Sequence, residues 1–155
     1  MANTFTQLHI QLIFAVQNRT SLIDKYWKDR LYAYMTGIIQ NNGHKLLIIN
    51  GMPDHVHVLI GFRTTQALSE LVQVVKRDSS KWINENKLVR GKFSWQEGFA
   101  AFSYSHSHLQ NVVEYIKNQE EHHRKLTFLE EYKSFLKKFE IEFDEKYIFK
   151  EIQDE

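Results

Sequence analysis

The chain has no cysteine among its 155 residues, which excludes disulfide bonds and thiolate metal ligands. Any bound ion must therefore be held by histidine, carboxylate or amide side chains. The chain also lacks a run of about 18 apolar residues that would span a bilayer, and its first residues do not resemble a secretion signal. We therefore expect a cytoplasmic protein without a membrane partner.

An excess of charge of one sign is also missing, because 20 Lys and Arg residues nearly balance 19 Asp and Glu residues. Net charge by itself thus does not indicate nucleic acid or any other partner. The length suits one hydrophobic core. We expect residues 1–155 to form a single domain, with the core sheet and helices at about 5–104 and an added C-terminal segment at about 107–155.

The most informative motif that is present is a pair of histidines, His55 and His57, separated by Val56. The flanking apolar residues and the turn sequence Met52-Pro53-Asp54 indicate a β-strand, in which alternate side chains point to the same face. Two imidazoles on one face at this spacing can bind one metal ion, while the valine faces a packed core. The pair supplies only two ligands, so other residues must complete such a site.

Hydrophobic periodicity predicts an α+β fold. Alternation with period two indicates a first strand, and apolar residues at three- and four-residue spacing indicate helices. The expected order is strand, helix, strand, strand, helix, strand, which is the ferredoxin-like split βαβ arrangement with helices on one face of an antiparallel sheet. The expected elements are a strand at 6–17, a helix at 24–42, strands at 44–50 and 54–60, a helix at 66–87, and a strand at 93–104 broken at Gly98.

In this fold the first and third strands are central neighbours. Gln7, His9 and Gln11 alternate with the apolar positions of the first strand. They should therefore lie beside His55 and His57, on the face that the two helices leave open.

A further helix is expected at about 108–125, with Ser107 and Gln110 as its capping box. Tyr115 and Gln119 lie one turn apart at the margin of its apolar face, so the phenol and the amide can approach another surface together. Taken alone, the pair also fits a packed tyrosine and a solvated glutamine. Another helix is expected near 129–139, followed by a short irregular or edge segment at 141–149.

Three motifs occur in order along the chain: Asp54-His55-Val56-His57-Val58-Leu59-Ile60, Phe93-Ser94-Trp95-Gln96-Glu97-Gly98-Phe99 and Tyr115-Ile116-Lys117-Asn118-Gln119-Glu120-Glu121-His122-His123. Together they resemble the single-tyrosine HUH transposases of bacterial insertion sequences of the 200/605 type, and the related domesticated transposases of repetitive extragenic palindromes. The resemblance implies an α+β fold whose added helix carries the catalytic tyrosine.

It also implies that His55, His57 and Gln119 hold a divalent metal, Mg²⁺ or Mn²⁺, and that Tyr115 is the nucleophile. The implied reaction cleaves and rejoins single-stranded DNA at hairpin-marked ends through a 5′-phosphotyrosine. A homodimer is implied as well, in which the tyrosine helix completes the site of its own subunit or of its partner.

Basic residues and polar neighbours of the histidines are the candidate DNA contacts: His9, Gln11, Arg19, Lys76, Arg77 and Arg124. We expect Trp95 to belong to the core, and His106 and His108 to be solvent-exposed beside a helix cap. His122 and His123 cannot both face one ion on a continuous helix. His122 falls in the same sector as Tyr115 and Gln119 and could alone touch the site, but we expect it to be solvated.

Two other functions stay open at this point. One is a non-catalytic ferredoxin-like module that binds nucleic acid on its open sheet face. The other is a small metal-dependent hydrolase, which would leave Tyr115 without a role.

Overall fold

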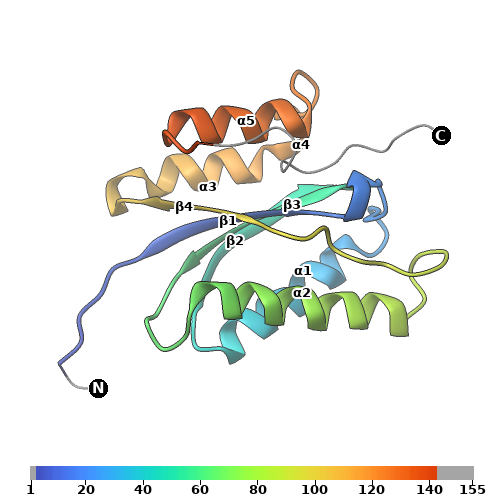
Figure 1. Cartoon of the computed structure of the whole chain (residues 1–155), viewed down its shortest axis with the longest axis horizontal. Helices are drawn as coiled ribbons and strands as arrows, with labels where there is room; N and C mark the ends of the chain where they lie inside the picture. The colour runs from blue at the N-terminus through green and yellow to red at the C-terminus, as the bar shows by residue number, and fades with distance from the viewer. Residues whose placement is uncertain (1–2, 143–155) are drawn as a thin grey trace.

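The computed structural model describes residues 3–142, which form a four-stranded antiparallel sheet covered by helices on both faces (Figure 1). The strands lie in the order β2-β3-β1-β4, so the predicted split βαβ arrangement is confirmed. No helix in this part of the chain is long and apolar enough to cross a membrane. The elements are β1 (His9–Ala15), α1 (Lys28–Asn41), β2 (Lys45–Met52), β3 (His55–Gly61), α2 (Leu68–Glu85), β4 (Ala100–Tyr104), α3 (Leu109–Lys117), α4 (Gln119–His122) and α5 (Phe128–Lys138), with 3-10 turns η1 (Gln17–Arg19) and η2 (His106–His108).

The register of β1 against β3 determines which side chains share a face. His57 is paired with Ile13 and His55 with Ala15, whereas Phe14 is paired with Val56. Directly paired residues point to the same side of a sheet. The histidines therefore share one face with Ile13 and Ala15, and the other face is apolar.

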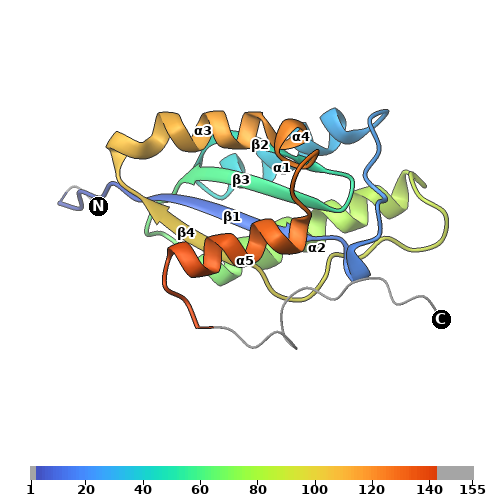
Figure 2. The same cartoon turned by 90° about the horizontal axis from the view of Figure 1, so that it is seen from above.

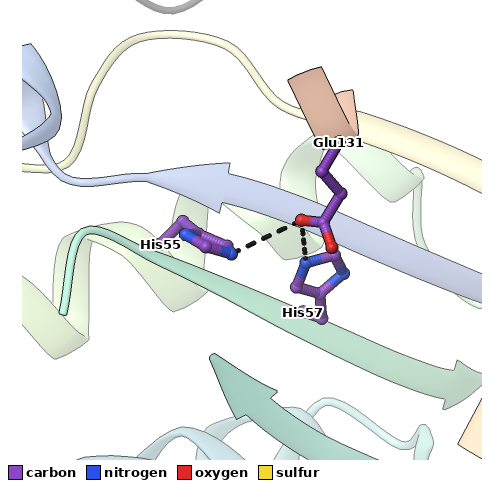
Figure 3. A group of neighbouring side chains, drawn as sticks. All are labelled: His55, His57 and Glu131. Carbon is purple, nitrogen blue, oxygen red and sulfur yellow. Dashed lines mark hydrogen bonds and ion pairs between the residues drawn. The ribbon is translucent and has the colours of Figure 1, made fainter. Parts of the chain in front are cut away.

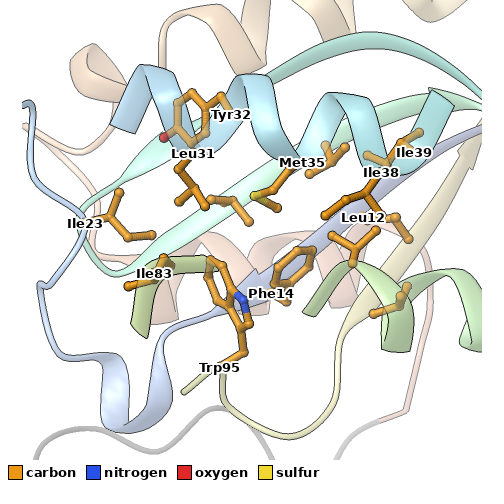
Figure 4. Packing of buried hydrophobic residues seen from close by; sticks show 14 of the residues in the cluster. Leu12, Phe14, Ile23, Leu31, Tyr32, Met35, Ile38, Ile39, Ile83 and Trp95 are labelled. Atoms are coloured by element: carbon orange, nitrogen blue, oxygen red, sulfur yellow. The ribbon is translucent and has the colours of Figure 1, made fainter. Parts of the chain in front are cut away.

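The apolar face packs against α1 and α2 and forms the largest core of the protein (Figure 4). Phe14 and Trp95 meet edge to face with their ring centroids 4.9 Å apart, and the indole nitrogen of Trp95 donates a hydrogen bond to Ser79. The expectation that Trp95 belongs to the core is confirmed. This packing fixes the position of the sheet, whose opposite face carries the histidines.

The predicted fourth strand is correct only in its second half. Residues 100–104 pair with β1, while the first half contributes a single bridge between Trp95 and Val16. Gly98, at the predicted break, has a φ of 89°, a backbone conformation that residues with a Cβ atom rarely adopt. The chain thus turns at Gly98 before it re-enters the sheet.

The helix predicted at 108–125 is in fact two short helices, α3 and α4, separated at Asn118. The amide of Asn50 on β2 donates hydrogen bonds to the carbonyls of Ile116 (3.0 Å) and Lys117 (3.2 Å). These carbonyls are thereby bonded from outside the helix, which accounts for its end at this point.

The predicted capping box at Ser107 and Gln110 is wrong. Ser107 instead lies in the turn η2, where its hydroxyl bonds that of Ser105. A capping box does occur later, where Thr127 and Glu130 begin α5.

The histidine-bearing face is not left open, which corrects the expectation from the sequence. Figure 2 shows α3 and α5 lying across it, with α3 beside β2 and β3 and α5 over β1 and β4. Each helix covers a small apolar cluster; the two clusters share no buried residue, and the half-buried Tyr104 packs against both. A polar seam lies between them. Of the expected segment at 141–149, residues 143–149 lie outside the described residues.

Candidate active site

His55 and His57 lie at the base of the seam between α3 and α5, and both side chains are fully buried. The Nδ1 atom of His55 is 2.7 Å from the Asp54 carboxylate, and the Nδ1 atom of His57 is 2.7 Å from the amide oxygen of Gln11. Both acceptors favour a proton on Nδ1, which aims each Nε2 atom into the seam. Metal-binding histidines in proteins are commonly oriented in this way.

The structure also brings Gln119 of α4 and Tyr115 of α3 close to these two histidines. The side-chain oxygen of Gln119 is 3.2 Å from Nε2 of His55, and Gln119 is fully buried. The ring centroid of Tyr115 is 6.1 Å from that of His57. All four residues named from the sequence thus meet within one chain.

Glu131, on α5, is the residue of the site that the sequence interpretation missed. Its oxygen Oε1 lies 2.9 Å from Nε2 of His57 and 3.5 Å from Nε2 of His55 (Figure 3). Its other oxygen, Oε2, accepts hydrogen bonds from the Tyr115 hydroxyl and from the Gln119 amide. One carboxylate therefore contacts all four of the other groups.

A signal for Glu131 does exist in the sequence. It lies three residues after Phe128 and four before Phe135, so it shares a helical face with two large apolar residues. An acidic residue on the apolar face of a helix is costly unless it has buried partners. The sequence does not identify those partners, because the histidines lie more than 70 residues earlier in the chain.

The electrostatics of the seam are dominated by this carboxylate. Burial on its own would raise the pKa of Glu131, but hydrogen bonds from His123, His55 and His57 lower it well below its usual range. Burial would lower the pKa of His55, yet its contacts with Asp54 and Glu131 raise it overall. For His57 burial prevails, and its pKa is lowered. The seam therefore keeps Glu131 ionised.

Tyr115 is held as a neutral phenol in this arrangement. Burial, followed by the adjacent charge of Glu131, raises its pKa well above the ordinary value. The hydroxyl donates a hydrogen bond to the carboxylate. The proton is thus on the tyrosine.

His122 and His123 both belong to the site, contrary to the expectation that His122 is solvated. The ring of His122 stacks on Tyr115 at 4.3 Å, and Nε2 of His123 lies 3.2 Å from Glu131. The expectation assumed a continuous helix, whereas the break at Asn118 places His122 in a separate short helix, α4, and His123 directly after it. The ring of Phe128 stacks on that of His55, with the ring centroids 4.1 Å apart.

The donor set fits a divalent ion. Ligand atoms of His55, His57 and Glu131 lie within 4.8 Å of one another, so these three buried residues could hold a metal. Two imidazole nitrogens, a carboxylate oxygen and the nearby amide oxygen of Gln119 are suitable ligands for ions of intermediate hardness.

The six candidate DNA contacts do not form one surface. Gln11 lies in the seam, and the ring of His9 lies near that of His106 farther along the same face. Arg19 lies over the ring of Phe128. The remaining three are Lys76 and Arg77 on α2, across the sheet, and Arg124 in the turn after α4, beside Glu121.

Comparison with known proteins identifies the family. The family model described as "Transposase IS200 like" matches residues 4–119. The chain belongs to the IS200-like transposases. The match includes His55, His57, Tyr115 and Gln119 and ends before Glu131.

One relative of this IS200-like transposase is the ISDra2 transposase TnpA of Deinococcus radiodurans, 26% identical over 119 residues that span 73% of this chain and 84% of the relative. A crystal structure of a putative transposase from the same species superimposes with a TM-score of 0.62 at 23% identity, covering 76% of this chain and 94% of that one. A REP-associated tyrosine transposase bound to a REP hairpin gives a TM-score of 0.60 at 13% identity, covering 78% and 72%. The two structures show that the fold is shared.

Proposed function

We propose that this transposase cleaves and rejoins single-stranded DNA at hairpin-marked ends, with Tyr115 as the nucleophile. The observation that carries the proposal is the meeting of the Tyr115 hydroxyl, two oriented histidines and two oxygen-bearing side chains in one buried seam. Membership in the transposase family and the hairpin bound to one relative support it.

In the proposed reaction the Tyr115 oxygen attacks the scissile phosphorus, and the bond from phosphorus to the 3′-oxygen breaks. The product is a 5′-phosphotyrosine and a free 3′-hydroxyl. A phenol is a weak nucleophile at neutral pH and must lose its proton as it attacks. Oε2 of Glu131 accepts the hydrogen bond from that hydroxyl and so positions the Tyr115 oxygen for attack. The proton lost by Tyr115 balances the one gained by the 3′-oxygen, and attack by another 3′-hydroxyl reverses the step.

His55 and His57, with Gln119 and Glu131, would hold the divalent ion, for which we propose Mg²⁺ or Mn²⁺. Such an ion withdraws charge from phosphate oxygens and stabilises the leaving oxygen. Asp54 and Gln11 act on this site by holding the imidazoles in the required tautomer.

The remaining parts of the proposal concern the assembly. We propose that the chain acts as one domain in the cytoplasm and pairs as a homodimer. In this structure Tyr115 lies beside the histidines of its own chain. An exchange of the tyrosine helix would require the same contacts from the partner subunit.

The decisive test is the covalent adduct. Labelled single-stranded hairpin DNA incubated with the protein and Mn²⁺ should yield a protein–DNA adduct that resists denaturing electrophoresis. Tyr115→Phe should abolish the adduct, with a loss of at least about 1,000-fold. Tyr26→Phe, which alters a tyrosine that is 81% exposed, should form it at the wild-type rate.

The result would contradict the proposal if Tyr115→Phe still formed the adduct, or if the wild type formed none with DNA drawn from the ends of its own element. DNA binding without any adduct would instead favour the non-catalytic binding module. Metal-dependent DNA breakage that survives Tyr115→Phe would favour a hydrolase.

Metal binding is tested separately by calorimetry with Mn²⁺. His57→Ala should weaken binding by more than about 100-fold, the upper range for loss of a residue that merely orients a ligand. His106→Ala, which removes an exposed histidine, should leave the affinity unchanged. Equal affinities of the two variants would place the ion elsewhere.

A further inference from the structure

A cavity of about 400 Å³ adjoins the seam that holds the histidines, and Gln11 and Tyr115 belong to its lining. Its walls come from the end of β4, from α3 and from the second half of α5. Tyr115 lines it, so the proposed nucleophile borders both the histidine seam and the cavity. Whatever binds there would lie directly beside the reacting phosphate.

The inner walls of the cavity are aromatic. The rings of Tyr104 and Phe139 meet edge to face at 5.5 Å, and those of Tyr115 and Phe135 meet edge to face at the same distance. All four side chains are half-buried, so each keeps part of its ring accessible. Half-buried rings of this kind stack on nucleobases in proteins that bind single strands.

The rim of the cavity is polar and carries a positive charge. Asn111 offers an amide donor and an amide acceptor, and Lys138 provides a cation. Both side chains are exposed, and neither makes a hydrogen bond or ion pair within residues 3–142. An amide can read the edge of a base, and a lysine can pair with a phosphate.

A buried hydrogen-bond chain connects the cavity to the histidines. The amide nitrogen of Gln11 donates to the Tyr104 hydroxyl at 2.7 Å, while its oxygen contacts Nδ1 of His57 at 2.7 Å. Gln11 is fully buried. The cavity wall and the proposed metal ligand are therefore held in one fixed arrangement.

The size of the cavity restricts its occupant. Ligand cavities in proteins measure about 300–1,000 Å³, so this one is near the lower end and suits a single nucleotide rather than a duplex. We propose that it binds the base of the nucleotide that flanks the scissile phosphate, and that Asn111 selects which base is accepted. This inference rests on the proposed strand cleavage by Tyr115.

The test uses a pool of hairpin DNA with randomised single-stranded flanks. Sequencing of the strands joined to the protein should show, in the wild type, a preference of about tenfold for one base at one position next to the cleaved phosphate. Asn111→Ala and Phe139→Ala should reduce it to less than about twofold and leave preferences elsewhere intact. Gln110→Ala, one residue from Asn111 but outside the cavity, should retain it.

The outcomes separate the two proposals. Failure of the wild type to form any adduct counts against strand cleavage by Tyr115. Adducts with no flanking preference, or with a preference that both cavity variants retain, overturn the base-binding cavity and leave strand cleavage standing.

A second measurement does not depend on cleavage. Tyr115→Phe keeps the aromatic ring and removes the nucleophilic hydroxyl. This variant should be irradiated with oligonucleotide pools that carry one 5-iodouracil or one 8-bromoadenine. Cross-links to the peptide that contains Tyr104 or Phe139 support the cavity, whereas cross-links confined to other peptides overturn it. Thermal melting of each variant confirms that it is folded.

Discussion

The two faces of the sheet contrast in how they are built. On one face, β1 and β3 pack against α1 and α2 in a single continuous apolar core. On the other face, α3 and α5 each cover a smaller cluster, and a buried polar seam separates them. The contrast indicates that the first face supplies stability, while the second gives up apolar packing in order to bury reactive groups.

The largest expected effect is on the apolar face. Phe14→Ala should lower the free energy of unfolding by about 3–5 kcal/mol, because it removes a fully buried ring and leaves a cavity. Phe5→Ala, at a position 91% exposed, should change stability little. Denaturant unfolding measures both variants. The contrast between the faces would fail if Phe14→Ala cost less than about 1 kcal/mol, or if it weakened Mn²⁺ binding as much as His57→Ala does.

An intermediate effect is expected in the seam. Glu131→Gln should lower the free energy of unfolding of the metal-free protein by about 2 kcal/mol at neutral pH, because hydrogen bonds to a charged group are lost. The pKa of Glu131 is lower in the folded state than in the unfolded state. Its contribution is therefore complete above its unfolded pKa of about 4.3 and is lost as the pH falls toward the folded value.

Unfolding curves recorded between neutral and acidic pH check this prediction. The difference between wild type and Glu131→Gln should shrink on acidification. Glu140→Gln, a matched change of an exposed carboxylate, should run parallel to the wild type. A difference that grows toward low pH would show that Glu131 is not stabilised as a carboxylate.

The smallest effect concerns two neighbouring cations on α2. Arg77 is 65% exposed at its side chain, whereas the ammonium of Lys76 donates to the carbonyls of Gln96 and Gly98. Arg77→Ala should weaken single-stranded DNA binding two- to threefold and reduce its salt dependence by about one charge. Arg77→Lys should preserve both quantities. An unchanged salt dependence in Arg77→Ala would show that Arg77 does not contact a DNA phosphate.

The sequence predicted the fold well where local periodicity determines it. Alternation along β1 and β3 follows from one apolar face, so strand positions and the histidine face could be predicted from the residues alone. The helices α1 and α2 follow from apolar spacing in the same way. These two helices pack on the apolar face of the sheet, which the alternation along the strands already defines.

The seam was less predictable because its geometry depends on contacts between distant residues. The end of α3 depends on Asn50 from β2, and Glu131 reaches the histidines only through the packing of α5. The capping pattern also occurs twice. At Ser107 a 3-10 turn uses the hydroxyl locally, while at Thr127 an amphipathic helix follows directly. Local sequence does not distinguish these outcomes.

The burial of the seam has a kinetic consequence. His55, His57 and Gln119 are fully buried and Glu131 is 1% exposed, with Phe128 stacked over His55. An ion can therefore reach the ligand atoms only after a local opening of the helices that cover the seam. The observed rate of metal binding should level off as the ion concentration rises, and its plateau should equal the rate of that local opening.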